Sequence, residues 1–153
     1  MDENTEKIKK CLAELTEEDI WRRPNASSNS VGALILHLCG NIRQYAISSL
    51  GRRPDVRRRD EEFNAREGYN RAELFAKLSG TVEEALAVIR KTEDEEMLRL
   101  RFVQGFEFSG IGIILHVVEH YSYHTGQIAF WTKLLRDKDL GFYAGVDLNV
   151  KNE

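Results

Sequence analysis

The chain has 153 residues, of which 42% are hydrophobic and 31% are charged. This length suits one domain with a buried core, and the composition excludes both a disordered chain and a membrane-embedded one. Lysine and arginine number 22 against 25 aspartates and glutamates, so the net charge is −3. Such a chain offers no positive field for a polyanion, and nucleic acid is disfavoured as a partner. We expect a single domain over residues 1–153.

The sequence carries no sign of export or membrane insertion. Its first fifteen residues alternate charged and apolar side chains, without the apolar core or cleavage site of a signal peptide. The longest uncharged run, residues 26–42, is too polar to span a bilayer. The two cysteines, Cys11 and Cys39, form neither a disulfide framework nor a C-x-x-C pair, which is typical of reduced core residues. We therefore expect a cytoplasmic protein without membrane contact.

Apolar residues recur every three or four positions in four stretches, which predicts four long helices. Asn29 and Ser30 are good N-caps for the second helix, which Gly51 should end, and Ser109 caps the fourth. A short helix is expected between the first helix and Pro24. The predicted long helices span about Glu3–Leu15, Val31–Leu50, Asn70–Ile89 and Gly110–Asp137.

The connections between these helices differ in composition. Arg52–Glu67 mixes both signs of charge densely, so we expect a solvated crossover loop between the second and third helices. Thr92–Glu96 should break the third helix, and residues 98–108 alternate around Gln104-Gly105, as in a hairpin or an extended crossover. Leu140–Glu153 should be an irregular segment laid over the helices. The prediction is an all-α four-helix bundle with a long crossover between helices 2 and 3.

Three of the four histidines, His116, His120 and His124, follow one another at a spacing of four in the predicted fourth helix. Successive imidazoles lie about 40° apart around the helix and one turn further on, so all three project from one side. Any adjacent pair could chelate one zinc or nickel ion. The fourth histidine, His37, lies in the second helix. A single helical histidine is more often a packed residue than a ligand, whereas three at this spacing favour a metal site.

The segment His116-Val-Val-Glu-His120-Tyr-Ser-Tyr-His124-Thr-Gly-Gln-Ile128 resembles the signature of the DinB superfamily, H-x-x-x-H followed directly by x-G-Q. Residues 29–41 resemble the second-helix segment of the same superfamily, and the resemblance to an uncharacterised bacterial branch spans nearly the whole chain. It implies the DinB fold and a divalent metal ion held by His37, His120 and His124. His116 is left outside this ligand set.

Four further residues are candidates for contacts around that site. His116 could hydrogen-bond to a ligand, shuttle a proton or simply pack, and the first and last of these are favoured. Asn41 follows His37 by one turn and is predicted to orient it or to line the pocket. Gln127 and Trp131 lie near the histidine face of the fourth helix, where Gln127 is a candidate for bonding a ligand or facing substrate. For the tryptophan, a core position is the commoner alternative.

Three neutral imidazoles leave a metal ion its full charge and open positions, which suits activation of a bound thiol or water. The resemblance implies a metal-dependent S-transferase using a low-molecular-weight thiol, with metal-dependent hydrolysis as the second class. The alternative is a stress-associated bundle that binds a metal or a small ligand without turnover, or that merely forms a homodimer. No committed acid, base or nucleophile is visible in the sequence, so catalytic residues stay unassigned.

Overall fold

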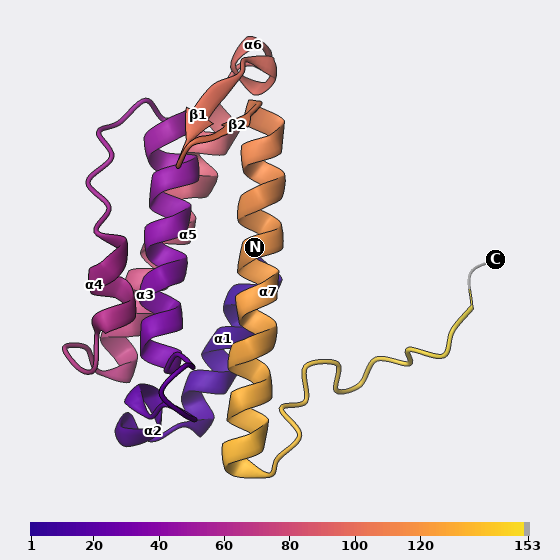
Figure 1. Ribbon diagram of the computed structural model, residues 1–153. Helices are drawn as coiled ribbons and strands as arrows, with labels where there is room; N and C mark the ends of the chain where they lie inside the picture. The colour runs from indigo at the N-terminus through magenta and orange to yellow at the C-terminus, as the bar shows by residue number, and fades with distance from the viewer. Residues whose placement is uncertain (152–153) are drawn as a thin grey trace.

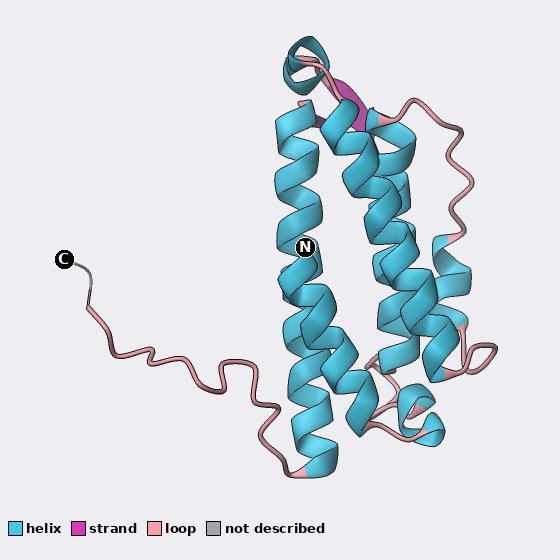
Figure 2. Ribbon diagram, turned by 180° about the vertical axis from the view of Figure 1, so that it is seen from behind, coloured by secondary structure: helices cyan, strands magenta, loops and turns pink. Residues whose placement is uncertain are grey.

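The structure, a computed structural model, describes residues 1–151 and is a bundle of four long helices (Figures 1 and 2). The four helices are α1 (Asp2–Glu14), α3 (Val31–Ile42), α5 (Arg71–Lys91) and α7 (Gly110–Arg136). Both α1 and α3 pack against α5 and against α7, so each helix has two neighbours. The predicted all-α class and four-helix bundle are confirmed.

Polar side chains cap the starts of α3, α5, α7 and the short helix α2 (Glu17–Trp21), at Ser30 and Ser109 as predicted. Ser30 and Ser109 each accept a hydrogen bond from the backbone N–H three residues later, at 3.2 and 3.0 Å. Asn70 and Glu73 form a reciprocal capping box at the start of α5. Thr16 does the same with Asp19 for α2. These caps satisfy donors that would otherwise lack partners.

The core lies between the four long helices and is apolar. Cys11 and Cys39 are buried in it as free thiols, as expected. Burial raises the pKa of both thiols to about 11, so both stay protonated at neutral pH. The largest fully buried side chains include Tyr45, Tyr121, Ile8, Leu12, Ile35, Leu38, Leu74 and Leu78.

The second predicted helix has the expected extent, but it consists of an α-helical part followed by a π-helical part. The α-helical part ends at Ile42, and a π-helix, η1 (Arg43–Leu50), continues it. The hydrogen bonds of a π-helix join residues five apart, and the backbone N–H of Gly51 accordingly donates to Ala46 O at 3.2 Å. Such π-helical turns are frequent at functional sites, and this one carries Tyr45.

The prediction that Arg52–Glu67 is a solvated loop is wrong in its central part. It contains α4 (Arg59–Asn64), which packs along α3 (Figure 1). The side chains of Arg57 and Glu62 are only 3% and 11% exposed and form an ion pair of 2.8 Å. The density of charges in this segment favoured exposure to solvent. Two opposite charges can nevertheless be buried together when they form an ion pair.

One end of the bundle is covered by a short helix and a hairpin. Thr92 ends α5, and α6 (Asp94–Leu98) follows within the segment expected only to break the helix. β1 (Arg101–Val103) then pairs antiparallel with β2 (Phe106–Phe108), so the hairpin alternative is confirmed. Its turn residues, Gln104 and Gly105, have φ of 52° and 83°. Two positive φ values give the turn that matches the twist of a hairpin.

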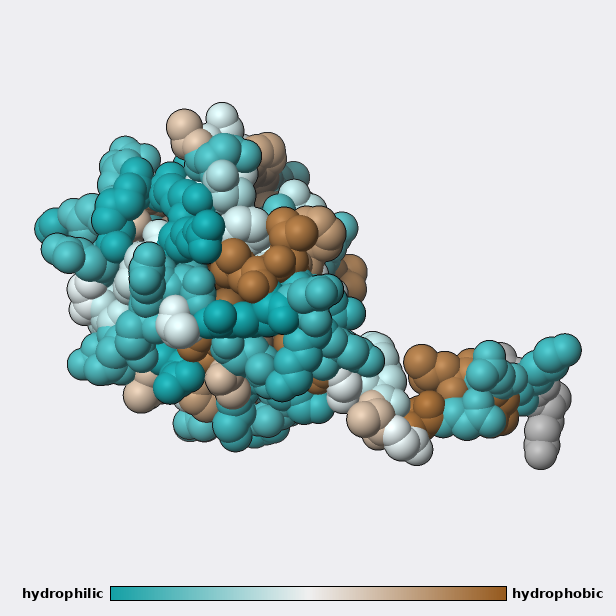
Figure 3. All heavy atoms as spheres, turned by 90° about the horizontal axis from the view of Figure 1, so that it is seen from below, coloured by the Kyte–Doolittle hydropathy of each residue, from teal (hydrophilic) through white to brown (hydrophobic). Residues whose placement is uncertain are grey.

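The carboxyl-terminal segment follows the bundle for a shorter distance than predicted. Lys10 donates to Gly141 O at 3.1 Å, and Lys7 donates to the Tyr143 hydroxyl at 3.0 Å. Beyond that contact, residues 144–151 lead away from the helices and expose apolar side chains (Figures 1 and 3). The expectation of a segment laid over the bundle is therefore wrong after residue 143, because only Leu140 and Phe142 pack on the core. Its last two residues lie outside the described residues.

Among residues 1–151, no helix combines the length and the apolar character that crossing a membrane requires.

Gly40→Ala should destabilise the fold. A Cβ at residue 40 would lie 1.8 Å from Glu62 Oε1 and 2.9 Å from Arg57 Nε, two atoms held in one buried ion pair. We expect the free energy of unfolding to fall by about 1–3 kcal/mol, measured by urea unfolding. Gly80→Ala is the control: nothing lies within 4 Å of its added Cβ, and helix propensity should raise stability by up to about 1 kcal/mol. Equal effects of the two substitutions would contradict this account.

Candidate metal centre

Three histidines from two neighbouring helices meet inside the bundle. His37 comes from α3, and His120 and His124 come from α7. One ligand nitrogen of each lies within 4.8 Å of those of the other two. The Nε2 atoms of His37 and His120 are 3.1 Å apart, and the rings of His120 and His124 have centroids 4.5 Å apart. The predicted proximity of α3 and α7 is thus confirmed, and the three imidazoles can hold one metal ion.

The spacing and protonation of this cluster fit a divalent ion. Tetrahedral zinc, about 2.0–2.1 Å from each ligand, places imidazole nitrogens about 3.3 Å apart. The 3.1 Å separation of the His37 and His120 nitrogens is close to that value. Burial, together with the neighbouring imidazoles, lowers the pKa of His120 to about 3. Its neutral form, which ligates metals, is therefore the form present at neutral pH.

The crossover orients His37 through a carboxylate. Glu62 Oε2 lies 3.1 Å from His37 Nδ1, and both carboxylate oxygens accept hydrogen bonds of 2.8 Å from Arg57. Burial alone would raise the pKa of Glu62, but the hydrogen bonds from Arg57 and His37 outweigh it and keep that pKa below its ordinary value. Arg57 Nη2 also lies 3.1 Å from His37 Nδ1, so both members of the ion pair contact this atom. A hydrogen bond from Nδ1 to the ionised Glu62 leaves Nε2 as the ligand atom. Carboxylates commonly orient metal-binding histidines in this way.

Gln127 contacts the Nδ1 atom of His124, as Glu62 contacts that of His37. Its Oε1 lies 2.7 Å from His124 Nδ1, one helical turn away on α7. Because an amide oxygen only accepts, the Nδ1 atom carries the proton and Nε2 keeps its lone pair. Burial lowers the pKa of His124, and this also favours the neutral ring. The Nδ1 atom of His120 is buried and has no hydrogen-bond partner among residues 1–151.

His116 lies outside the three-histidine cluster and has its own partners. Its ring stacks on Tyr45 of η1, with centroids 4.1 Å apart and planes inclined by 22°. Asn41 Nδ2 lies 3.2 Å from its Nε2, so this amide contacts His116 and not His37. Burial lowers the pKa of His116. Neutral His116 then accepts from Asn41 at Nε2 and carries its proton at Nδ1.

Trp131 is placed apart from these contacts. It lines a cavity of about 400 Å³ with Gln127, Leu34 and Phe130, at the α2 end of the bundle. Its Nε1 atom is buried without a hydrogen-bond partner in the described part of the chain. Within residues 1–151, this ring makes no aromatic ring contact and no hydrogen bond with the three histidines.

Two cavities open onto the cluster. One, of about 330 Å³, lies between α3, η1, the crossover and the hairpin, and is lined by His37, His116 and His120. The other, of about 680 Å³, lies over the outer face of α7 and is lined by His116, His120 and Glu119. His116 and His120 thus line openings on two sides, and His37 lines one of them.

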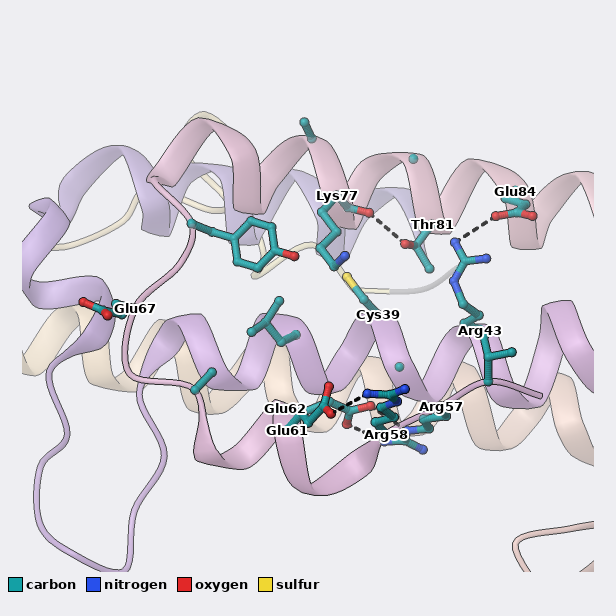
Figure 4. Close-up of a pocket in the computed structure, with 17 residues that line it drawn as sticks. Cys39, Arg43, Arg57, Arg58, Glu61, Glu62, Glu67, Lys77, Thr81 and Glu84 are labelled. Atoms are coloured by element: carbon teal, nitrogen blue, oxygen red, sulfur yellow. Dashed lines mark hydrogen bonds and ion pairs between the residues drawn. The ribbon is translucent and has the colours of Figure 1, made fainter. Parts of the chain in front are cut away.

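A third cavity, of about 640 Å³, lies on the opposite side of the Arg57–Glu62 pair, between α3, α4 and α5. Figure 4 shows Glu62 and Arg57 on one wall of it and Lys77 and Thr81 from α5 on the other. The pair therefore separates this cavity from the histidines. Sequence reasoning did not identify Arg57 or Glu62, because charge spacing in a crossover does not reveal which carboxylate will meet a histidine of another helix.

Residues 1–144 match the family described as "Protein of unknown function (DUF1572)". The chain belongs to that family. Its structure is similar to a DinB-like protein, YjoA, from Bacillus subtilis (TM-score 0.69, 16% identity, covering 92% of this chain and 91% of that one). A DinB-like protein from Bacillus cereus ATCC 10987 is similar as well (TM-score 0.66, 14% identity, covering 88% and 87%). Among curated proteins, none matches this sequence.

These comparisons confirm the resemblance noted in the sequence: this DUF1572 chain has the DinB-like fold. At such low identity, the likeness establishes the fold and leaves the chemistry to be argued from the site itself.

Glu62→Gln should weaken metal binding, and it should also lower the free energy of unfolding because it leaves the Arg57 charge buried and unpaired. The amide has a single oxygen and cannot replace the two carboxylate oxygens that accept hydrogen bonds from Arg57 and His37. His37 therefore loses its fixed orientation. We expect the zinc dissociation constant to rise about 10- to 100-fold in competition with a chromophoric chelator. Glu61→Gln is the matched control, because the neighbouring carboxylate is exposed and pairs only with exposed Arg58. A similar loss in both variants would rule out the orienting role.

Acid should destabilise the metal-free protein. The pKa of His120 falls from 6.5 to about 3 on folding, so between these values the unfolded chain binds a proton that the folded chain does not. Stability is therefore lost as pH falls below about 6.5. Between pH 7 and pH 5, His120 alone should lower the free energy of unfolding by about 1–2 kcal/mol. Urea unfolding in the presence of a chelator measures this, and His120→Ala should flatten the dependence.

Proposed function

We propose that this protein is a metal-dependent enzyme that binds one zinc or nickel ion at His37, His120 and His124 and transfers a low-molecular-weight thiol to a small electrophile. The observation that supports it best is the convergence of three imidazoles beside two cavities. A three-histidine site leaves coordination positions free, which distinguishes catalytic sites from closed structural ones.

A divalent ion in this site would supply the positive charge that favours the thiolate form of a bound thiol. The chain's own residues prepare the site for that role. Glu62 and Gln127 accept hydrogen bonds from the Nδ1 atoms of their histidines and leave the Nε2 atoms as the ligand atoms. In the transfer, the thiol gives its proton to solvent and its sulfur forms a bond with the electrophilic carbon. The leaving group departs with the electron pair of the bond that breaks.

Thiol transfer fits the smaller cavity better than hydrolysis does. Among its lining residues there is no carboxylate to act as a general base toward water. The larger cavity does contain one, Glu119, beside His116 and His120. Metal-dependent hydrolysis through that opening is the second candidate, and binding without turnover is the outcome to be tested against both. Homodimer formation and a cytoplasmic location stay predictions.

His120→Ala should abolish both metal binding and turnover, because two remaining ligands hold a metal ion weakly. His116→Ala should keep the metal, since its Nε2 is engaged by Asn41, and should lower the rate by about 10-fold. Metal content measured by mass spectrometry, followed by thiol consumption with a panel of thiols and electrophiles, checks both expectations.

The same assays separate the competing functions. Full metal occupancy without thiol, ester or amide turnover would overturn the enzymatic proposal and favour a binding protein. Activity that survives complete metal removal would overturn the metal-dependent mechanism. Loss of the metal from His116→Ala would show that the ligand set is wrong.

A further inference from the structure

The smaller cavity beside the histidines has aromatic walls. Tyr45 stacks on His116 at 4.1 Å, and Phe108 packs against both rings, with centroids 5.8 and 5.6 Å away. Phe106, from the same strand, faces the cavity with a ring that is 64% exposed. The Tyr45 hydroxyl donates to Gln104 Oε1 at 3.0 Å, so the turn of the hairpin is fixed to η1. These walls suit the flat or apolar body of a small molecule.

The charge of this cavity is positive. Two arginines line it, and no aspartate or glutamate does. The charge of Arg57 is already balanced by Glu62 behind it. Arg59 at the mouth differs: within residues 1–151 it makes no ion pair, and its guanidinium lies 4.6 Å from the centre of the Phe63 ring. That ring in turn packs against His37 at 4.5 Å, which places the free charge close to the candidate metal site.

The cavity on the far side of the Arg57–Glu62 pair provides a contrast. Its lining holds four cationic side chains and four carboxylates, and Arg58 pairs with Glu61 and Arg43 with Glu84, both at 3.0 Å (Figure 4). Balanced pairs of this kind give a solvated surface without a preference for the sign of a ligand. The histidine cavity is different because its free guanidinium has no carboxylate to satisfy it.

We propose that this cavity selects anionic substrates with an aromatic or apolar body. A carboxylate of the substrate would pair with Arg59 while its body packs between Phe106, Phe108 and the Tyr45–His116 stack. This assignment rests on the proposed function, which it deepens by naming the substrate class. Guanidinium groups recognise carboxylates through two parallel hydrogen bonds, which gives direction as well as charge attraction.

Two pairs of probes test the proposal by isothermal titration. The zinc-loaded protein is titrated with 4-mercaptobenzoate and with its neutral counterpart 4-mercaptobenzamide, and the metal-free protein with benzoate and benzamide. In each pair we expect the anion to bind about 3- to 10-fold more tightly at low salt. Arg59→Gln should abolish that preference. Arg58→Gln should retain it, because the neighbouring arginine lines the other cavity. Raising the salt concentration should weaken it.

The outcomes distinguish this proposal from the one it rests on. Equal affinities for anion and amide in the wild type would overturn the substrate class, and a preference that survives Arg59→Gln would overturn its assignment to Arg59. Both outcomes leave thiol transfer possible. A benzoate preference that depends on Arg59, without tighter binding of either thiol to the zinc-loaded protein, would support the anionic cavity and count against thiol transfer. Absence of binding by all four probes would overturn the substrate class.

Discussion

The ion pair between Arg57 and Glu62 is the interaction on which the candidate site depends. It takes two charges out of water, and its burial is sustained because the pair is doubly hydrogen-bonded and Glu62 also meets His37. Removing one partner of such a pair would leave the other charge buried and unsatisfied, a loss of about 3–5 kcal/mol. The pair attaches the crossover to α3, orients one histidine, and separates the histidine cavities from the cavity against α5. Gly40 belongs to the same arrangement, because only a residue without a side chain lets Glu62 approach α3 so closely.

The histidines divide into a cluster and a single residue because of their neighbours. His120 and His124 face α3, where His37 meets them, whereas His116 is stacked on Tyr45 of η1 and engaged by Asn41. Along α7, one regular spacing of four thus serves two environments. The rings of His37, His120 and His124 are placed to hold a metal ion, whereas the ring of His116 lines the adjacent cavity.

Periodicity was sufficient to predict the four long helices, and Ser30 and Ser109 cap two of them as predicted. The convergence of His37 with His120 and His124 followed from the resemblance, because spacing alone left the pairing open. Two features were not predictable from local sequence. Burial of Arg57 and Glu62 depends on a contact between distant segments, and the path of the chain after Tyr143 depends on the lack of apolar partners. Local sequence patterns predict the secondary structure of a segment, but they do not predict which distant charged residue will pair with one of its side chains.

The histidine cluster and the aromatic wall of the smaller cavity come from different segments of the chain. The nitrogens that face one another are supplied by α3 and α7, while Phe106 and Phe108 come from β2, which is closed by its own tight turn and fixed to Tyr45 through Gln104. Substitutions in this short strand change the shape of the cavity without altering the residues that orient the histidines. A duplicated copy of the gene could therefore acquire a cavity of different shape through a few changes between residues 102 and 108, with the three-histidine cluster retained.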